Sequence, residues 1–135
     1  MPYRFMLDTN VISELIKDPM GKVARLLETE GESSVCSSII VASELRYVVA
    51  KCGSKELSLR VYAALSAIDI LPFDIPADIE YGKLRALLAA KGKPPIGPND
   101  LLIAAYALSL GLTLVTDNVL EFKRAKGLSV VNWRR

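Results

Sequence analysis

Near its N-terminus the chain reads Tyr3-Arg4-Phe5-Met6-Leu7-Asp8-Thr9-Asn10, and the helix-like segment Val11–Ile16 follows at once. The apolar run is typical of a short buried strand, and the three polar residues after it are favoured at helix starts. This order predicts a strand that leads directly into a helix, with Asp8 at the junction. Open α/β sheets keep their chemistry at such junctions. The alternative is that Asp8 only caps the helix.

Short apolar runs alternate with helix-like segments along the rest of the chain. We expect strands at Tyr3–Leu7, Ser34–Ser37, Asp69–Leu71, Leu112–Thr116 and Ser129–Trp133, and helices at Val11–Lys17, Lys22–Glu30, Ile40–Ala50, Lys55–Ala67, Ala77–Lys91, Asp100–Leu110 and Leu120–Ala125. Strands separated by helices pair in parallel through right-handed crossovers. The pattern predicts an α/β fold of three layers, α/β/α, with a mostly parallel central sheet of four to five strands.

The bulk composition is that of one ordinary globular domain. The chain has 135 residues, 51% of them hydrophobic and 24% charged, so we expect a single domain over residues 1–135. No run approaches the ~20 apolar residues of a membrane span, and no signal peptide is evident, so we expect a cytoplasmic protein without membrane association. A net charge of +2 does not by itself indicate a nucleic-acid binder.

The chain has no histidine, which excludes histidine bases and histidine metal ligands. Cys36 and Cys52 form no C-x-x-C motif, so neither a zinc nor a redox site is indicated, and we expect both to fill the core. Any metal must therefore be bound by oxygen.

Two more acids stand in special places. Glu44 lies on the apolar stripe of its own predicted helix, so it should face a cation, a metal or a cleft, unless the helix is rotated and Glu44 pairs with a surface lysine. Asp100 follows the run Pro95-Ile96-Gly97-Pro98-Asn99 and opens the longest apolar helix. Its alternative role is an acid in the first turn, behind Asn99 as the N-cap.

A fourth acid comes from the segment after Thr116. Asp117 directly follows the strand and Glu121 comes four residues later, and the residues alone leave the choice between them open. If these acids converge, their mutual repulsion favours a divalent cation, and a site of oxygen ligands selects Mg²⁺ or Mn²⁺. Such an ion activates water and stabilises the charge on a phosphodiester, so phosphodiester hydrolysis is the expected chemistry.

These motifs resemble the PIN-domain nucleases, and within them the VapC-type toxins of bacterial and archaeal toxin–antitoxin pairs. The resemblance rests on Met6-Leu7-Asp8-Thr9-Asn10, on Ser43-Glu44-Leu45, on Pro95-Ile96-Gly97-Pro98-Asn99-Asp100 with Leu101–Ala105, on Leu114-Val115-Thr116-Asp117-Asn118 with Glu121-Phe122, and on Val130-Val131-Asn132-Trp133. In order and spacing it covers essentially the whole chain. At the fourth position many relatives read Thr-x-Asp, whereas this chain has the amide of Asn118.

The resemblance implies a metal-dependent endoribonuclease toxin. Its catalytic acids would be Asp8, Glu44, Asp100 and Asp117, with Asp8 and Asp100 as ligands to Mg²⁺ or, in its place, Mn²⁺. It also implies a homodimer that is neutralised by a VapB-type antitoxin and that contacts DNA only through this antitoxin. A mean hydropathy of +0.30 favours apolar surface for association, with the helices Val11–Lys17, Lys22–Glu30 and Ile40–Ala50 as candidates for the partner groove.

Two other functions compete with this interpretation. A non-catalytic PIN-like module would bind RNA or a partner through the same cleft, but it would not need Asp8, Glu44 and Asp100 together. A phosphatase of the Asp-x-Asp type would need a second acid at Asn10. The sequence does not indicate which RNA is cut, because selectivity for RNA usually comes from loops and unpaired bases.

Overall fold

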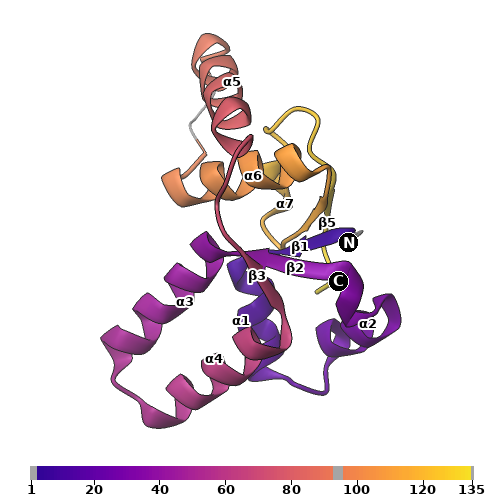
Figure 1. Cartoon of the computed structure of the whole chain (residues 1–135), viewed down its shortest axis with the longest axis vertical. Helices are drawn as coiled ribbons and strands as arrows, with labels where there is room; N and C mark the ends of the chain where they lie inside the picture. The colour runs from indigo at the N-terminus through magenta and orange to yellow at the C-terminus, as the bar shows by residue number, and fades with distance from the viewer. Residues whose placement is uncertain (1–2, 93–95, 135) are drawn as a thin grey trace.

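Five parallel strands form the centre of the molecule, in the order β3-β2-β1-β4-β5 (Figure 1). The computed structural model describes residues 3–92 and 96–134. The strands are β1 (Phe5–Leu7), β2 (Val35–Ser38), β3 (Asp69–Leu71), β4 (Thr113–Val115) and β5 (Val130–Val131). All four strand pairs in the described chain are parallel. The expected parallel sheet of four to five strands is therefore confirmed, with five strands.

Helices cover both faces of this sheet. They are α1 (Thr9–Lys17), α2 (Lys22–Glu30), α3 (Ile39–Cys52), α4 (Lys55–Ala67), α5 (Ala77–Ala90), α6 (Pro98–Leu110) and the single turn α7 (Val119–Phe122), with a 3₁₀ turn at Glu32–Ser34. In Figure 1, α1 to α4 lie on one side of the strands and α5 to α7 on the other. The expected α/β/α layers are therefore confirmed.

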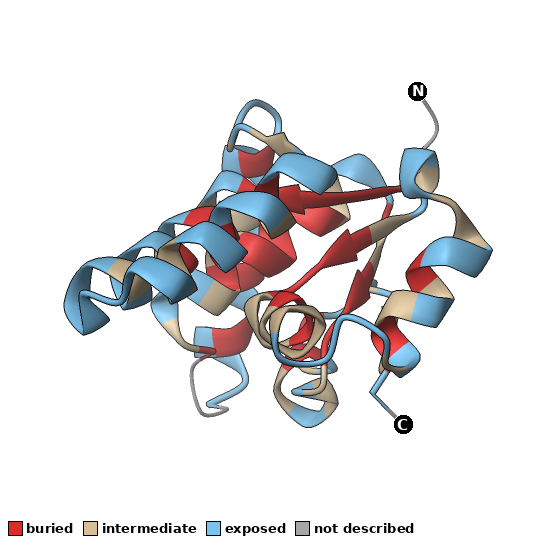
Figure 2. Ribbon diagram, turned by 90° about the horizontal axis from the view of Figure 1, so that it is seen from below, coloured by how far each residue is buried: buried red, intermediate tan, exposed pale blue. Residues whose placement is uncertain are grey.

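The core lies between the sheet and the inner helix faces. Met6 and Leu7 of β1 and Leu114 and Val115 of β4 are fully buried, and Figure 2 shows these strands enclosed by the helices. Helix α6 buries six residues on several sides, as its uniformly apolar sequence predicts. The two central strands and α6 therefore provide a rigid base for the residues at their ends.

Several details differ from the sequence expectations. Helix α1 begins at Thr9 rather than at residue 11, because Asp8 is its N-cap. Helix α6 begins at Pro98 after an N-cap at Gly97, so the predicted start at Asp100 was wrong, and Asn99 lies inside the helix and does not cap it. Proline suits a first helical position because it lacks only an N–H that the helix leaves unpaired there. Cys36 is buried, but Cys52 ends α3 at the surface and does not fill the core.

Residues 93–95, which include Pro95 of the run before Asp100, lie outside the described residues. Over the residues that the structure describes, no helix combines the length and the apolar character that crossing a bilayer requires.

Candidate active site

The register of the sheet brings two distant polar segments together. Leu7 at the end of β1 pairs with Ser37 of β2 on one side and with Val115 of β4 on the other. The residues that follow these strands, Asp8 and Thr116, therefore lie side by side at the carboxyl edge of the sheet. This is the edge where open parallel sheets bind their ligands.

Asp8 is held in a fixed orientation at this edge. Its side chain is only 3% exposed, and its Oδ1 accepts a hydrogen bond from the backbone N–H of Thr9 over 2.8 Å, which caps α1. Its Oδ2 accepts from the Thr116 hydroxyl over 2.7 Å and from the Asn10 amide over 3.0 Å. Burial raises the pKa of Asp8, and these hydrogen bonds oppose that rise. Asp8 thus caps the helix and also faces the cluster.

Thr116 and Asn10 tie β4 to α1 around this carboxylate. The Asn10 amide nitrogen also donates to the Thr116 hydroxyl over 3.2 Å, and its Oδ1 accepts from the backbone N–H of Asp117 over 3.0 Å. The Thr116 hydroxyl further accepts from the backbone N–H of Asn118 over 3.1 Å. The two strand-to-helix turns therefore behave as one hydrogen-bonded unit.

Glu44 reaches the same edge from α3. Its carboxylate accepts hydrogen bonds from the Thr9 hydroxyl and, over 3.4 Å, from the side-chain amide of Asn99. Glu44 faces a cleft, as predicted. The alternative, a rotated helix in which Glu44 pairs with a surface lysine, is wrong. Glu44 therefore bridges the starts of α1 and α6.

Asp100, in the first turn of α6, lies beside Glu121 of α7. Its pKa is raised to about 8, chiefly by burial, then by a hydrogen bond with the Glu121 side chain and by the charges of Asp8, Glu121 and Glu44. Glu121 is itself oriented by the Asn118 amide, which donates to it over 3.0 Å. Two carboxylates this close repel each other when both are ionised, and this favours the protonated form of Asp100.

Asp117 contacts a different part of the chain from these acids. It forms an ion pair with Arg134, which also contacts Glu14 of α1 over 3.3 Å. Among the acids expected from the sequence, the structure brings together Asp8, Glu44 and Asp100. It adds Glu121 to them and places Asp117 at the C-terminal arginine instead.

Comparison with known proteins shows to which family this chain belongs. A family model described as PIN domain matches residues 5–128, which is most of the chain. The chain belongs to the PIN-domain family. It is 37% identical over 131 residues to the tRNA(fMet)-specific endonuclease VapC of Shigella flexneri, with 96% of this chain and 98% of that protein covered. It is 38% identical over 131 residues to ribonuclease VapC2 of Rickettsia felis, with 96% and 97% covered.

Solved structures agree with this assignment. VapBC from Salmonella typhimurium bound to DNA superposes on this PIN domain with a TM-score of 0.87 at 36% identity, covering 97% of this chain and 98% of the other. VapBC2 from Rickettsia felis, bound to a DNA fragment from their promoter, gives 0.86 at 36% identity, covering 96% and 98%. Within the PIN family the chain is thus a ribonuclease of the VapC type, and the phosphatase alternative was wrong.

The donor set of this PIN domain suits a hard divalent cation, but the side chains are not arranged around one. In the described part of the chain, no group of three or more acidic or thiol side chains is placed so that it could hold an ion as it stands. Asp8 and Glu44 are turned to hydroxyl and amide donors, and Asp100 is turned to Glu121. A cation would lower the pKa of Asp100, which burial raises most and the neighbouring carboxylates raise further, and the long Glu44 and Glu121 side chains would supply more oxygens to the cation.

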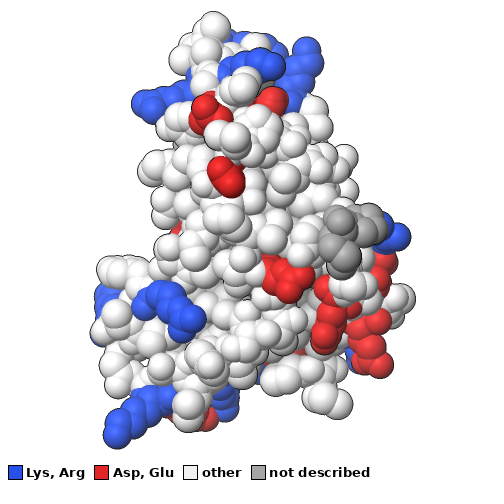
Figure 3. Space-filling view, in the orientation of Figure 1, with Lys and Arg blue, Asp and Glu red and all other residues white. Residues whose placement is uncertain are grey.

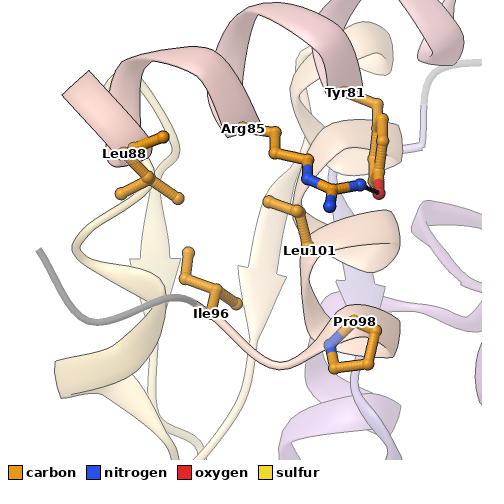
Figure 4. Close-up of a pocket in the computed structure, with 7 residues that line it drawn as sticks. Tyr81, Arg85, Leu88, Ile96, Pro98 and Leu101 are labelled. Carbon is orange, nitrogen blue, oxygen red and sulfur yellow. Dashed lines mark hydrogen bonds between the residues drawn. The ribbon is translucent and has the colours of Figure 1, made fainter. Parts of the chain in front are cut away.

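Two hollows lie near this cluster. One, of about 310 Å³ between α5 and α6, contains none of the four acids and is lined by Tyr81, Arg85, Leu88, Ala89, Ile96, Pro98 and Leu101 (Figure 4). The second, of about 540 Å³, includes part of the site and is lined by Thr9, Ile40, Ser43, Glu44, Tyr47, Val48 and Asn99. The second is named the α3 groove below.

Sequence reasoning missed the residues that orient the acids. Thr116 and Asn99 were assigned no part in the site, and Thr9 and Asn10 were considered only as helix caps. Thr116 could have been found, because a threonine at the end of a strand that pairs with β1 must lie next to Asp8. The contact of Asn99 with Glu44 has no comparable signal, since the two are 55 residues apart.

Proposed function

We propose that this ribonuclease is a Mg²⁺- or Mn²⁺-dependent endonuclease toxin that hydrolyses RNA at Asp8, Glu44, Asp100 and Glu121. The observation that carries the proposal is the convergence of four acids from α1, α3, α6 and α7 at one edge of the sheet, where the pKa of Asp100 is raised to about 8. A purely structural cluster would gain nothing from placing like charges together, because each raises the energy of the others.

Asp8 and Asp100 are the residues that would hold the ion. When bound, such an ion lowers the pKa of a water molecule and stabilises the charge that develops on a phosphodiester. The orientation of Asp8 is fixed by hydrogen bonds from Thr9, Asn10 and Thr116. Mn²⁺ should substitute for Mg²⁺, because both accept carboxylate oxygens.

Glu44 and Glu121 would position water and accept its proton during hydrolysis. Thr9 and Asn99 hold Glu44, and Asn118 holds Glu121, so both carboxylates are oriented by neutral donors. In the reaction, an oxygen of water forms a bond to phosphorus, the bond to the leaving sugar oxygen breaks, and that oxygen takes up a proton. Glu121 is therefore our candidate for the fourth acid, in place of Asp117.

Transfer RNA is the substrate to test first, because relatives from Shigella flexneri and Salmonella typhimurium are named tRNA(fMet)-specific endonucleases. We expect a tRNA(fMet) transcript to be cut in Mg²⁺, the cut to stop in excess EDTA, and Mn²⁺ to restore it. Undiminished cleavage in EDTA would contradict the metal site. No cleavage of any RNA in Mg²⁺ would favour the non-catalytic PIN-like module.

We also propose a VapB-type antitoxin and a homodimer as partners. The relatives of known structure include VapBC pairs bound to DNA, so we expect DNA contact only through the antitoxin. A groove of about 470 Å³ between α1 and α4 supports an apolar partner segment and is lined by Leu15, Ile16, Lys17, Pro19, Arg60, Ala63 and Ala64. Co-purification with the antitoxin and light scattering of the free protein test the two partners, and a strict monomer would contradict the dimer.

A further inference from the structure

The α3 groove follows one face of its helix away from the acids. Its α3 residues are Ile40, Ser43, Glu44, Tyr47 and Val48, whose spacing of three and four places them on the same side. Thr9 and Asn99, the hydrogen-bond partners of Glu44, complete the lining. Its volume of about 540 Å³ lies in the range of pockets for small organic groups, about 300–1,000 Å³.

Tyr47 presents an aromatic ring in this groove that the fold does not use. Its side chain is 64% exposed, and its neighbour Val48 is 43% exposed. Over residues 3–92 and 96–134, no hydrogen bond, ion pair or ring contact engages the Tyr47 side chain. An exposed aromatic one helical turn from a catalytic carboxylate is therefore available to a ligand.

We propose that the α3 groove binds an unpaired nucleobase of the substrate RNA, next to the scissile phosphate, with Tyr47 as its stacking platform. The inference rests on the proposed ribonuclease function. Thr9, Glu44 and Asn99 belong both to the groove and to the site, so a strand whose phosphate reaches Glu44 has Tyr47 in the same groove, one helical turn away. Bases of single-stranded RNA stack on aromatic side chains, and this favours RNA over a peptide as the occupant.

Charge along α3 agrees with a polyanion in this direction. Lys51 lies in the last turn of α3, one turn beyond Tyr47. Figure 3 shows lysine and arginine side chains gathered at the end of the molecule formed by α3 and α4, and others over α5. A strand that leaves the acidic cluster along α3 therefore moves toward cations, which attract its next phosphates.

The first test compares Tyr47→Ala, Tyr47→Phe and Tyr62→Ala. Tyr62 is a matched control, because it is a 62% exposed tyrosine on α4 that does not line the groove. With a tRNA(fMet) transcript in Mg²⁺, we expect Tyr47→Ala to raise KM about 5- to 150-fold, the range for removing one base–aromatic stack. Its kcat should stay within about threefold, since stacking acts equally before and during the reaction. Tyr47→Phe and Tyr62→Ala should behave as the wild type.

The second test locates the base. Oligoribonucleotides that span the mapped cut site carry one abasic position, which is moved one nucleotide at a time, and binding is measured with Asp8→Asn protein so that no cleavage occurs. At one position next to the cut, the abasic oligonucleotide should lose as much affinity as Tyr47→Ala causes. Combining the two changes should cause no further loss, because both remove the same stack.

Three results would overturn the proposal while the wild type still cleaves RNA. Tyr47→Ala could leave KM unchanged, or its effect could add to that of the abasic change at every position. Alternatively, Tyr47→Ala could weaken only inhibition by the antitoxin, which would make the groove a protein-binding site. Failure of the proposed function is distinct, because the wild type itself would then be inactive in Mg²⁺.

Discussion

The starts of α1 and α6 both present an aspartate to the same cluster, but they hold it in different ways. Asp8 is buried, caps its helix and accepts three hydrogen bonds from neutral donors. Asp100 is half-buried and lies in the first turn of a helix whose cap is Gly97, with Glu121 as its hydrogen-bond partner. The fold therefore fixes Asp8, whereas the charge of Asp100 depends on burial and on the other acids around it.

The largest effect should come from removing either charge. Asp8→Asn and Asp100→Asn should each lower kcat/KM for RNA by at least about 1,000-fold, because each removes roughly 4 kcal/mol of transition-state stabilisation at the proposed ion. Cleavage of a tRNA(fMet) transcript by folded, nuclease-free protein measures this. Near wild-type turnover of either variant in Mg²⁺ would contradict the proposal that Asp8 and Asp100 bind the same ion.

The second prediction separates the two candidates for the fourth acid. Glu121→Gln should reduce activity about 10- to 100-fold, as removal of a residue that orients a metal site does. Asp117→Asn should stay within about threefold, because it breaks only a partly exposed ion pair with Arg134. Equal losses in both variants would contradict the distinction, and Glu14→Gln is a control for weakening the Arg134 contacts alone.

The third prediction concerns the hydroxyl that orients Asp8. Thr116→Val keeps the shape of the side chain but removes the hydrogen bond to Asp8, so activity should fall about 10-fold. Restoration by Thr116→Ser would assign the effect to the hydroxyl. An active Thr116→Val protein would show that burial, Asn10 and the backbone N–H of Thr9 are enough to fix this carboxylate.

The fourth prediction is a difference in stability between the two aspartate variants. In EDTA at about pH 8, Asp100→Asn should melt roughly 3 °C above Asp8→Asn, which corresponds to about 1 kcal/mol for a chain of this size. Replacing Asp100 relieves repulsion, whereas the amide in Asp8→Asn points a donor at groups that already donate. Equal melting temperatures would remove the contrast between the two helix starts.

The last prediction is a pH dependence of the stability of the metal-free protein. The pKa of Asp100 is about 8 in the folded chain, above its usual value of 3.8, so folding favours the protonated form. The stability of the wild type should therefore fall as pH rises from about 5 to about 8, once other titrations are subtracted by comparison with Asp100→Asn. Saturating Mg²⁺ should remove this difference, and an identical pH dependence of both proteins in EDTA would contradict it.

The alternation of apolar runs was enough to predict the layers of the fold, because the spacing of apolar residues within each segment indicates a strand or a helix. Helices α2 and α4 agree with the prediction at both ends, whereas α3 and α7 differ from it at both ends. The start of α6 was wrong, since Gly97 and Asn99 are both acceptable caps and packing decides between them. Asp8, Glu44 and Asp100 could be found from their places at strand ends and on helix faces.

The partners of these acids could not be predicted in the same way. Asn99 and Glu44 are 55 residues apart, and Arg134 meets Asp117 across 17 residues, so neither contact has a local signal. The choice of Glu121 over Asp117 depends on the rotation of α7, a single turn anchored by the fully buried Phe122. Rotation of so short an element is set by the finished core and not by its own periodicity.

The position of β1 in the middle of the sheet has a consequence for synthesis in the cell. This strand is made first, but its neighbour β4 contributes residues 113–115, and Glu121 comes later still. At about 5–20 residues per second, roughly 6–23 s separate the translation of residue 8 from that of residue 121. During that interval the growing chain lacks the strand that pairs with β1 on its other side, and the proposed cluster of acids is incomplete.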